Sequence, residues 1–227
     1  MNALRTAQAA DLPRMMEIIA QAQAYMAACG VNQWQDGYPD EARIAEDIRR
    51  QNARVYVEGQ DVVAMAVLVT DGEPTYARIY QGEWKTQEPY ACIHRLAVCA
   101  ERRGKGVADA MLSACEAQAL AQGLDAVRID THRDNHAMQR LLLRNGYVRC
   151  GIIYLESGSE RIARGAGAGL VQVVADAGGH DVFAMADVAA NRAAQGQQAG
   201  LAVGDGHQVD AEGYLQIAVL EKALEHT

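Results

Sequence analysis

A basic, glycine-rich stretch lies between an apolar run typical of a strand and an apolar run typical of a helix. The stretch is CAERRGKGVADAML, residues 99–112, and it follows ACIHRLAV, residues 91–98. The apolar residues after it recur at helical spacing until Gly123, which predicts a strand, a turn and a helix in this order. A strand followed directly by a helix requires a sheet with a helix packed on it, so the chain has both α and β structure.

The turn between these two elements favours a ligand with several negative charges. N–H groups at the start of a helix have no partner within the helix and attract anions. Gly104 and Gly106 let an anion approach the backbone, and Arg103 and Lys105 supply positive charge. We interpret the turn as a pyrophosphate site, with a solvent-exposed basic turn as the alternative. The net charge of −8 means that any anion site is local and argues against nucleic acid as a partner.

The rest of the pattern predicts a mixed sheet. Asp11 and Pro13 are placed to start a helix that Gly30 ends, and a loop at 31–40 leads to a short second helix. Further strands are expected at 53–59, 61–70, 126–130 and 147–155, and a helix at 135–146. Because several strands precede the first strand–helix–strand unit, we expect a mixed α/β sheet and not a purely parallel one.

Two nucleotide-binding motifs can be compared with the turn. The P-loop pattern G-x-x-x-x-G-K-[ST] does not occur in the sequence. The dinucleotide pattern G-x-G-x-x-G matches at Gly104 and Gly106, but Asp109 occupies its third glycine position. Asp130, at the end of the next strand, is placed like the ribose-binding acid of that fold. A dinucleotide-binding oxidoreductase therefore remains an alternative.

The same turn, together with its surroundings, resembles another family. Arg103–Gly104–Lys105–Gly106–Val107–Ala108 matches the pattern [RQ]-x-x-G-x-[GA] and follows the strand ending in LAV; the segments RIDTHRDN and RNGYVRCG come after it. Over residues 1–162 the sequence resembles the GNAT superfamily of acyl-CoA-dependent N-acyltransferases. The resemblance implies the GNAT fold, a mixed sheet that opens between the strands IHRLAV and VRID.

The resemblance also implies acetyl-CoA as co-substrate. Its pantetheine arm would pair with the backbone of Leu96, Ala97 and Val98, and its pyrophosphate would lie on the N–H groups of residues 104–108. Asn135 would bond to the pantetheine or phosphate region, or simply cap the helix that follows it. The residues expected at the cofactor are Leu96, Ala97, Val98, Arg103, Gly104, Lys105, Gly106, Val107, Ala108 and Asn135.

The implied reaction is direct attack of an amine on the thioester. A lysine-like amine has a pKa of about 10.4 and must lose a proton first, so a positioned base helps. His94 is the candidate base, and a structural histidine within the strand is the alternative. Leu142 stands where many family members have a tyrosine that protonates the leaving thiolate. Tyr147 and Tyr154 are weak candidates for that role.

The acceptor is expected to be a small-molecule or peptide amine that enters over the loop after the first helix. Trp34 and Tyr38 are the expected acceptor-binding residues, and Trp84 could also line the entrance. The carboxylates of Asp36, Glu83 and Glu88 would suit a cationic amine. Because Leu142 replaces the usual acid, a non-catalytic acetyl-CoA-binding module is the second hypothesis.

The composition changes after residue 162. Ala and Gly dominate 163–227, which predicts a tail that is poorly ordered or that comes from a shifted reading frame, after a short strand near 159–163. Five scattered cysteines without a C-x-x-C pair predict reduced thiols in the cytoplasm and no metal site. We expect no signal peptide and no membrane association, since no apolar run is long enough to span a bilayer. The sequence leaves open whether the chain forms a homodimer.

Overall fold

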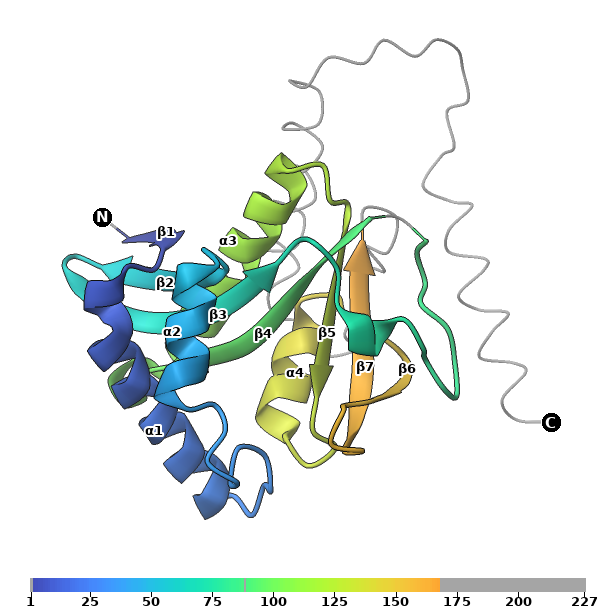
Figure 1. Cartoon of the computed structure of the whole chain (residues 1–227), viewed down its shortest axis with the longest axis horizontal. Helices are drawn as coiled ribbons and strands as arrows, with labels where there is room; N and C mark the ends of the chain where they lie inside the picture. Colours follow the sequence, from blue (N-terminus) through green and yellow to red (C-terminus); the bar gives the residue numbers. More distant parts are fainter. Residues whose placement is uncertain (1, 88, 168–227) are drawn as a thin grey trace, which may run out of the picture. The chain divides into compact units, whose positions relative to one another are not determined.

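Seven strands form one sheet in the computed structural model, which describes residues 2–87 and 89–167. Their order across the sheet is β1-β2-β3-β4-β5-β7-β6, and only β4 and β5 run parallel (Figure 1). The strands are β1 (Asn2–Thr6), β2 (Ala53–Glu58), β3 (Asp61–Val69), β4 (Tyr90–Val98), β5 (Ala126–Thr131), β6 (Val148–Tyr154) and β7 (Glu160–Gly167). The expected mixed sheet is confirmed, and β1 is an edge strand that the sequence pattern did not predict.

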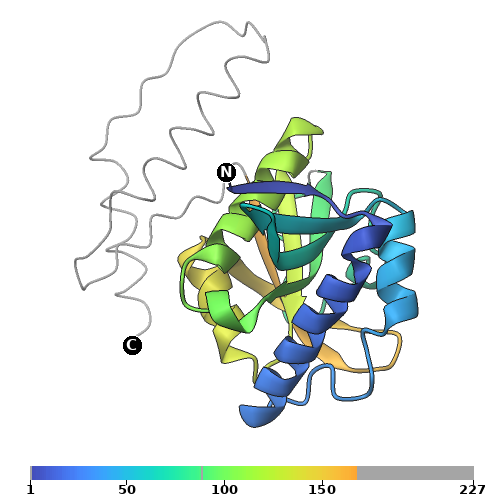
Figure 2. The same ribbon diagram turned by 90° about the vertical axis from the view of Figure 1, so that its left-hand side faces the viewer.

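Four α-helices cover the two faces of this sheet within the described residues. They are α1 (Leu12–Ala28), α2 (Glu41–Arg49), α3 (Val107–Ala121) and α4 (His136–Arg144). In Figure 2, α1 and α2 lie on one face, and α3 and α4 lie on the other. Apolar side chains of α1 and α3, among them Ile18 and Met111, are fully buried against the central strands. None of the helices in the described ranges is long and apolar enough to cross a membrane.

The sheet opens between β4 and β5. These strands pair only from Tyr90 to Cys92 on β4 and from Ala126 to Arg128 on β5. Beyond Cys92, β4 continues to pair with β3, but its other edge faces away from β5. The opening expected between these two strands is therefore present.

A bulge in β4 lies at the start of this opening. The register with β3 shifts between the pairs Met65↔Ala97 and Val67↔His94, so β4 has one extra residue there. Arg95 takes up the bulge with φ at 54°, a left-handed conformation that is uncommon for a residue with a side chain. The bulge determines which side chains of β4 face the opening.

Asp11 does not cap α1 as the sequence pattern suggested. It precedes the helix, but its carboxylate makes no hydrogen bond to the first turn. Instead, Asp11 Oδ2 accepts from Arg5 Nη1 and from the Gln8 backbone N–H, both at 2.7 Å. Because β1 brings Arg5 within reach, a charged partner replaces the helix as the main contact of this carboxylate.

The last described strand is longer than the sequence predicted. β7 runs to Gly167, and its residues 163–167 pair with β5 from Gly167↔Ala126 to Ala163↔Asp130. The expectation of a short strand near 159–163 is wrong, because small residues fit where neighbouring atoms lie close. A side chain at Gly165 would come within 3.3 Å of Cys150 Sγ. The expected boundary at 162 thus falls inside β7, while the prediction for the rest of the tail lies outside the described residues.

We expect two truncations to separate the fold from the tail. A chain that ends after Gly167 should melt at the temperature of the full chain, because every described strand is intact. A chain that ends after Ile162 loses the pairing of β7 with Ala126–Asp130 of β5 and should melt more than about 5 °C lower. Thermal unfolding followed by circular dichroism measures both. Equal melting temperatures for the two truncated chains would contradict this boundary.

Candidate functional site

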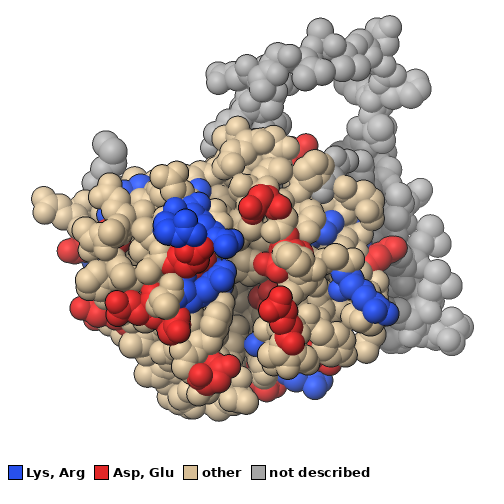
Figure 3. Space-filling view, in the orientation of Figure 1, with Lys and Arg blue, Asp and Glu red and all other residues tan. Residues whose placement is uncertain are grey.

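A cleft follows the opening between β4 and β5. The 32–38 loop and residues of α1 and α2 form one side, residues of α4 and the 155–161 segment form the other, and β4 residues 93–98 lie between them. Figure 3 shows the cleft on the surface, with basic side chains gathered over α2 and acidic side chains on the opposite rim. Residues that are far apart in the sequence thus share one solvent-accessible groove.

The turn before α3 presents backbone N–H groups at one end of this cleft. Gly104 and Gly106 have φ at 73° and 78°, the left-handed region that glycine adopts without strain. A Cβ at either position would meet no atom within 4 Å, so the space in front of the turn is open. Among the described residues, the N–H groups of Gly106, Val107 and Ala108 have no hydrogen-bond acceptor. This arrangement fits a phosphate group.

The side chains of this turn differ in what they do. Arg103 Nη2 donates to the Gln21 carbonyl oxygen at 2.7 Å, and its guanidinium lies 4.8 Å from the centre of the Tyr25 ring. Val107 is buried in the core, whereas Lys105 is exposed. Arg103 therefore ties the turn to α1, and the backbone carries most of the anion-binding capacity.

Asp109 does not face the anion site. Its carboxylate accepts from Arg144 Nε and Nη2, both at 2.7 Å, and from Asn145 Nδ2 at 2.9 Å. These contacts join the start of α3 to the end of α4. A dinucleotide-binding fold has a mostly parallel sheet and a third glycine where this chain has Asp109. Because the sheet is mixed and Asp109 forms an ion pair, the dinucleotide-binding alternative is not supported.

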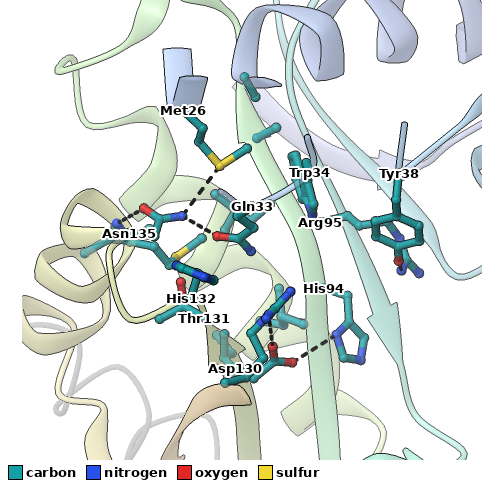
Figure 4. A pocket seen from close by; sticks show the side chains of 18 of the residues that line it. Met26, Gln33, Trp34, Tyr38, His94, Arg95, Asp130, Thr131, His132 and Asn135 are labelled. Carbon is teal, nitrogen blue, oxygen red and sulfur yellow. Dashed lines mark hydrogen bonds and ion pairs between the residues drawn. The ribbon is translucent and has the colours of Figure 1, made fainter. Parts of the chain in front are cut away.

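Asn135 lies across the cleft from α1. Its Oδ1 accepts from the Met138 backbone N–H at 3.1 Å, so it caps α4 as one reading of the sequence had it. Its Nδ2 donates to Gln33 Oε1 at 2.9 Å (Figure 4). The Gln33 contact was not predicted, because it joins segments that are about a hundred residues apart. Contact of Asn135 with a cofactor remains a prediction.

The second half of β4 offers a free backbone edge to the cleft. Ala97 and Val98 pair with Met65 and Ala64 of β3, while no β5 residue pairs beyond Cys92. Leu96, Ala97 and Val98 all line the cleft. An extended ligand with amide groups can add to this edge as an extra strand does.

His94 lies in the cleft between two carboxylates. Its Nε2 is 3.1 Å from Glu73 Oε2. Its Nδ1 is 3.9 Å from Asp130 Oδ1, and Figure 4 shows this second pair. The side chain is only 16% exposed. The contact with His94 lowers the pKa of Glu73 to about 2, so Glu73 is ionised at neutral pH.

Asp130 has two further neighbours. Tyr76, on the short 3₁₀ helix Pro74–Tyr76, donates its hydroxyl hydrogen to Asp130 Oδ1 at 2.7 Å. Burial raises the pKa of Tyr76 well above its usual value, which keeps this hydroxyl protonated. Arg161 Nε lies 3.8 Å from Asp130 Oδ2. Asp130 is thus held by groups from two separate segments.

The opposite side of the cleft contains a second charged group. Arg95 Nε lies 2.9 Å from Asp47 Oδ2, and the two side chains are 6% and 2% exposed. Arg95 also donates to the Tyr38 hydroxyl, and Arg43 lies 3.3 Å from Asp47. Trp34 and Tyr38 both line the cleft, as the sequence predicted, and Tyr38 is the one held by a cation.

Several residues considered from the sequence lie elsewhere. Trp84 does not line the cleft as expected; it packs 5.2 Å from the Tyr76 ring and donates to the Tyr76 carbonyl oxygen. Tyr147 is buried and donates to Glu116, while Tyr154 packs against Tyr80, so neither lines the cleft.

The remaining sequence candidates divide between the core and the surface. Leu142 is fully buried. Asp36 lines the cleft, Glu83 does not, and Glu88 lies outside the described residues. In the described part of the chain, no three His, Cys, Asp or Glu side chains form an arrangement that could hold a metal ion.

Comparison with known proteins identifies the family to which the chain belongs. The model of the acetyltransferase (GNAT) family matches residues 15–147. The chain belongs to the GNAT acetyltransferase family. The fold and the recognition made from the sequence are both confirmed. No curated protein sequence matches the chain significantly.

Solved structures of GNAT proteins resemble the chain over most of their length. A GNAT family acetyltransferase from Streptococcus agalactiae is 32% identical, with a TM-score of 0.65 over 73% of this chain and 95% of that one. A PaiA N-acetyltransferase from Thermoplasma acidophilum, solved with coenzyme A, is 14% identical, with a TM-score of 0.56 over 74% and 99% of the two chains. A ribosomal-protein-alanine N-acetyltransferase from Brucella melitensis is 16% identical, with a TM-score of 0.54 over 73% and 99%. The last two likenesses show the fold alone.

Sequence reasoning missed several groups that the GNAT cleft brings together. Glu73, Arg161 and the pair Asp47–Arg95 carry no motif. Asp130 was noticed only as a ribose-binding acid of a different fold. The available indication was that charged residues follow the ends of strands, and this holds for Glu73 after β3 and for Asp130 near the end of β5.

Proposed function

We propose that this GNAT protein transfers an acetyl group from acetyl-CoA to an amine by direct attack of the amine on the thioester. The observation that supports the proposal most is the placement of His94. It lies in the same cleft as the free edge of β4 and the open turn at Gly104 and Gly106.

Three parts of the cleft fit coenzyme A. The N–H groups of residues 104–108 suit the pyrophosphate, the backbone of residues 96–98 suits the amides of pantetheine, and Asn135 lines the facing wall, where its Nδ2 would have to exchange Gln33 or Met26 for the cofactor. Bound acetyl-CoA supplies the activated acetyl thioester. The protein's part is to hold it and to prepare the amine.

Preparing the amine is a problem of proton removal. At neutral pH an alkylamine is almost wholly protonated, and freeing it costs about 4 kcal/mol. His94 is the base that we assign to this step. A thiol with a pKa near 8.5 leaves without a strong acid, so a buried leucine at 142 does not prevent the reaction.

A non-catalytic acetyl-CoA-binding module is the second candidate, because Leu142 cannot donate a proton. Free-thiol release from acetyl-CoA in the presence of a panel of amines distinguishes the two. Amine-dependent release supports the transferase. Binding of acetyl-CoA without release by any amine supports the module.

The cofactor assignment predicts a specific effect of Gly106→Val. Acetyl-CoA at a hundredfold excess over its Kd should stabilise the wild-type protein by about 2.7 kcal/mol and raise its Tm. A valine at φ 78° strains the turn and fills the open space, so the variant should lose this rise. Gly123→Val is the matched control, since Gly123 lies at the other end of α3 with φ at 77° and similarly open space. A full rise in Gly106→Val would contradict the assignment.

A further inference from the structure

The two ring nitrogens of His94 face different carboxylates. Nε2 is 3.1 Å from Glu73 Oε2, and Nδ1 is 3.9 Å from Asp130 Oδ1. A neutral imidazole carries one N–H, and the closer carboxylate, that of Glu73, favours this hydrogen on Nε2 although the two groups are not aligned as a hydrogen bond. Nδ1 then directs its lone pair toward Asp130.

The gap between Nδ1 and Asp130 Oδ1 has room for a donor. Two electron-pair acceptors 3.9 Å apart do not bond to each other, but a nitrogen about 2.9 Å from each can donate to both. His94 and Asp130 both line the cleft, and Figure 4 shows their side chains directed toward one another. An ammonium group fits this gap because it has three donors.

The charges around the gap also favour a cation. Asp130 from β5, with Tyr76 and Arg161 beside it, borders the gap, and Glu73 from the loop after β3 lies at the other ring nitrogen of His94. Arg161 lies near Oδ2 of Asp130, so Oδ1 is shared between the Tyr76 hydroxyl and the gap. The surroundings of His94 therefore contain two carboxylates and one guanidinium, which gives this part of the cleft a negative balance.

We propose that Asp130 and His94 together bind the ammonium group of an alkylamine acceptor, and that Glu73 is a positioning residue that keeps the N–H of His94 on Nε2. This inference rests on the proposed acetyl transfer. It deepens that function by naming the acceptor as an alkylamine that is cationic in solution, rather than an arylamine.

In this arrangement, each proton that the ammonium group loses has an acceptor. The ammonium gives one proton to Nδ1 of His94, and the free amine attacks the acetyl carbonyl. The C–N bond forms and the C–S bond breaks, with the electron pair remaining on sulfur. The nitrogen loses its second proton to the thiolate, and the imidazolium of His94 returns its proton to solvent.

The first test is Asp130→Asn, which keeps an oxygen to accept the Tyr76 hydroxyl but removes the charge. We expect KM for an alkylamine such as 1,4-diaminobutane to rise about tenfold to a hundredfold, with a smaller change in kcat. An arylamine, which is uncharged at neutral pH, should be a poor acceptor for both proteins. Asp61→Asn is the control, because Asp61 is an exposed carboxylate of the β2–β3 hairpin outside the cleft.

The second test concerns Glu73, and its first measurement does not depend on activity. Nitrogen-15 NMR of the imidazole should show the Nε2–H tautomer of His94 in the wild-type protein and in Glu73→Gln, whose side-chain oxygen still accepts. Glu73→Ala should show a mixture of tautomers and a kcat about tenfold lower. A thermal melt of each variant confirms that it is folded.

The outcomes distinguish a failure of the proposed function from a failure of the ammonium site. If the wild-type protein acetylates no amine, the proposed function fails and the ammonium assignment fails with it. If alkylamines are acetylated with an unchanged KM in Asp130→Asn, the Asp130 assignment alone is overturned. An unchanged Nε2–H tautomer in Glu73→Ala overturns the positioning role of Glu73.

Discussion

Replacing His94 with alanine should lower kcat/KM for amine acetylation by about 10² to 10⁴ while acetyl-CoA binding stays nearly intact. A positioned base contributes a factor of this size, because the amine must lose a proton before it attacks. His94 lines the cleft on β4, and its side chain makes no contact with the Gly104–Ala108 turn in the described structure. The cofactor should therefore bind to the variant much as it does to the wild type.

The pH dependence of the variant provides the decisive measurement. If His94 is the base, the alanine variant should regain activity as pH rises toward the pKa of the free amine, because hydroxide or solvent then supplies the deprotonated amine. His136→Ala is the matched control, since His136 begins α4 away from the gap between Glu73 and Asp130. Wild-type rate and pH profile in His94→Ala would assign proton removal to water or to another group.

Removing Asp47 should produce the largest loss of stability among single changes in the cleft. Asp47 is 2% exposed and faces Arg95, which is 6% exposed, at 2.9 Å. Replacing one member of a buried ion pair leaves the other charge without compensation, at a cost of about 3–5 kcal/mol. We expect this decrease in the free energy of unfolding for Asp47→Ala, measured by urea denaturation.

Two comparisons show whether burial is the cause. Glu17→Ala breaks the exposed pair with Arg14 and should change stability little, because such pairs are screened by water. The double variant D47L/R95M should be more stable than D47L, since the second change removes the uncompensated charge. If Asp47→Ala matched Glu17→Ala, the buried pair would contribute no more than a surface pair.

The features that the sequence predicted are local ones. The turn at Gly104 and Gly106 leads from β4 into a helix as expected, and the helix over 107–121 follows its apolar spacing. Asn135 caps α4, which the sequence offered as the alternative to a cofactor contact. Each of these depends on neighbours within about one turn of the chain, so a short stretch of sequence contains all the information needed.

The failures occur where distant segments set the environment. Asp11 was expected to cap a helix but binds Arg5, because β1 pairs at the sheet edge and brings the guanidinium close. The Ala- and Gly-rich residues 163–167 were expected to leave the fold. They complete β7 instead, because their backbone pairs with β5 and β6, and Gly165 leaves room for the Cys150 side chain beside it.

By itself, the sequence determined the strand, turn and helix that offer backbone N–H groups to an anion, and the presence of a histidine on that strand. Only the tertiary structure decided what His94 faces. Glu73, His94 and Asp130 come from three separate segments. They meet where β4 bulges at Arg95 and stops pairing with β5. Their distances depend on the register of strands far apart in sequence, and hydrophobic patterning restricts that register only through which face each strand buries.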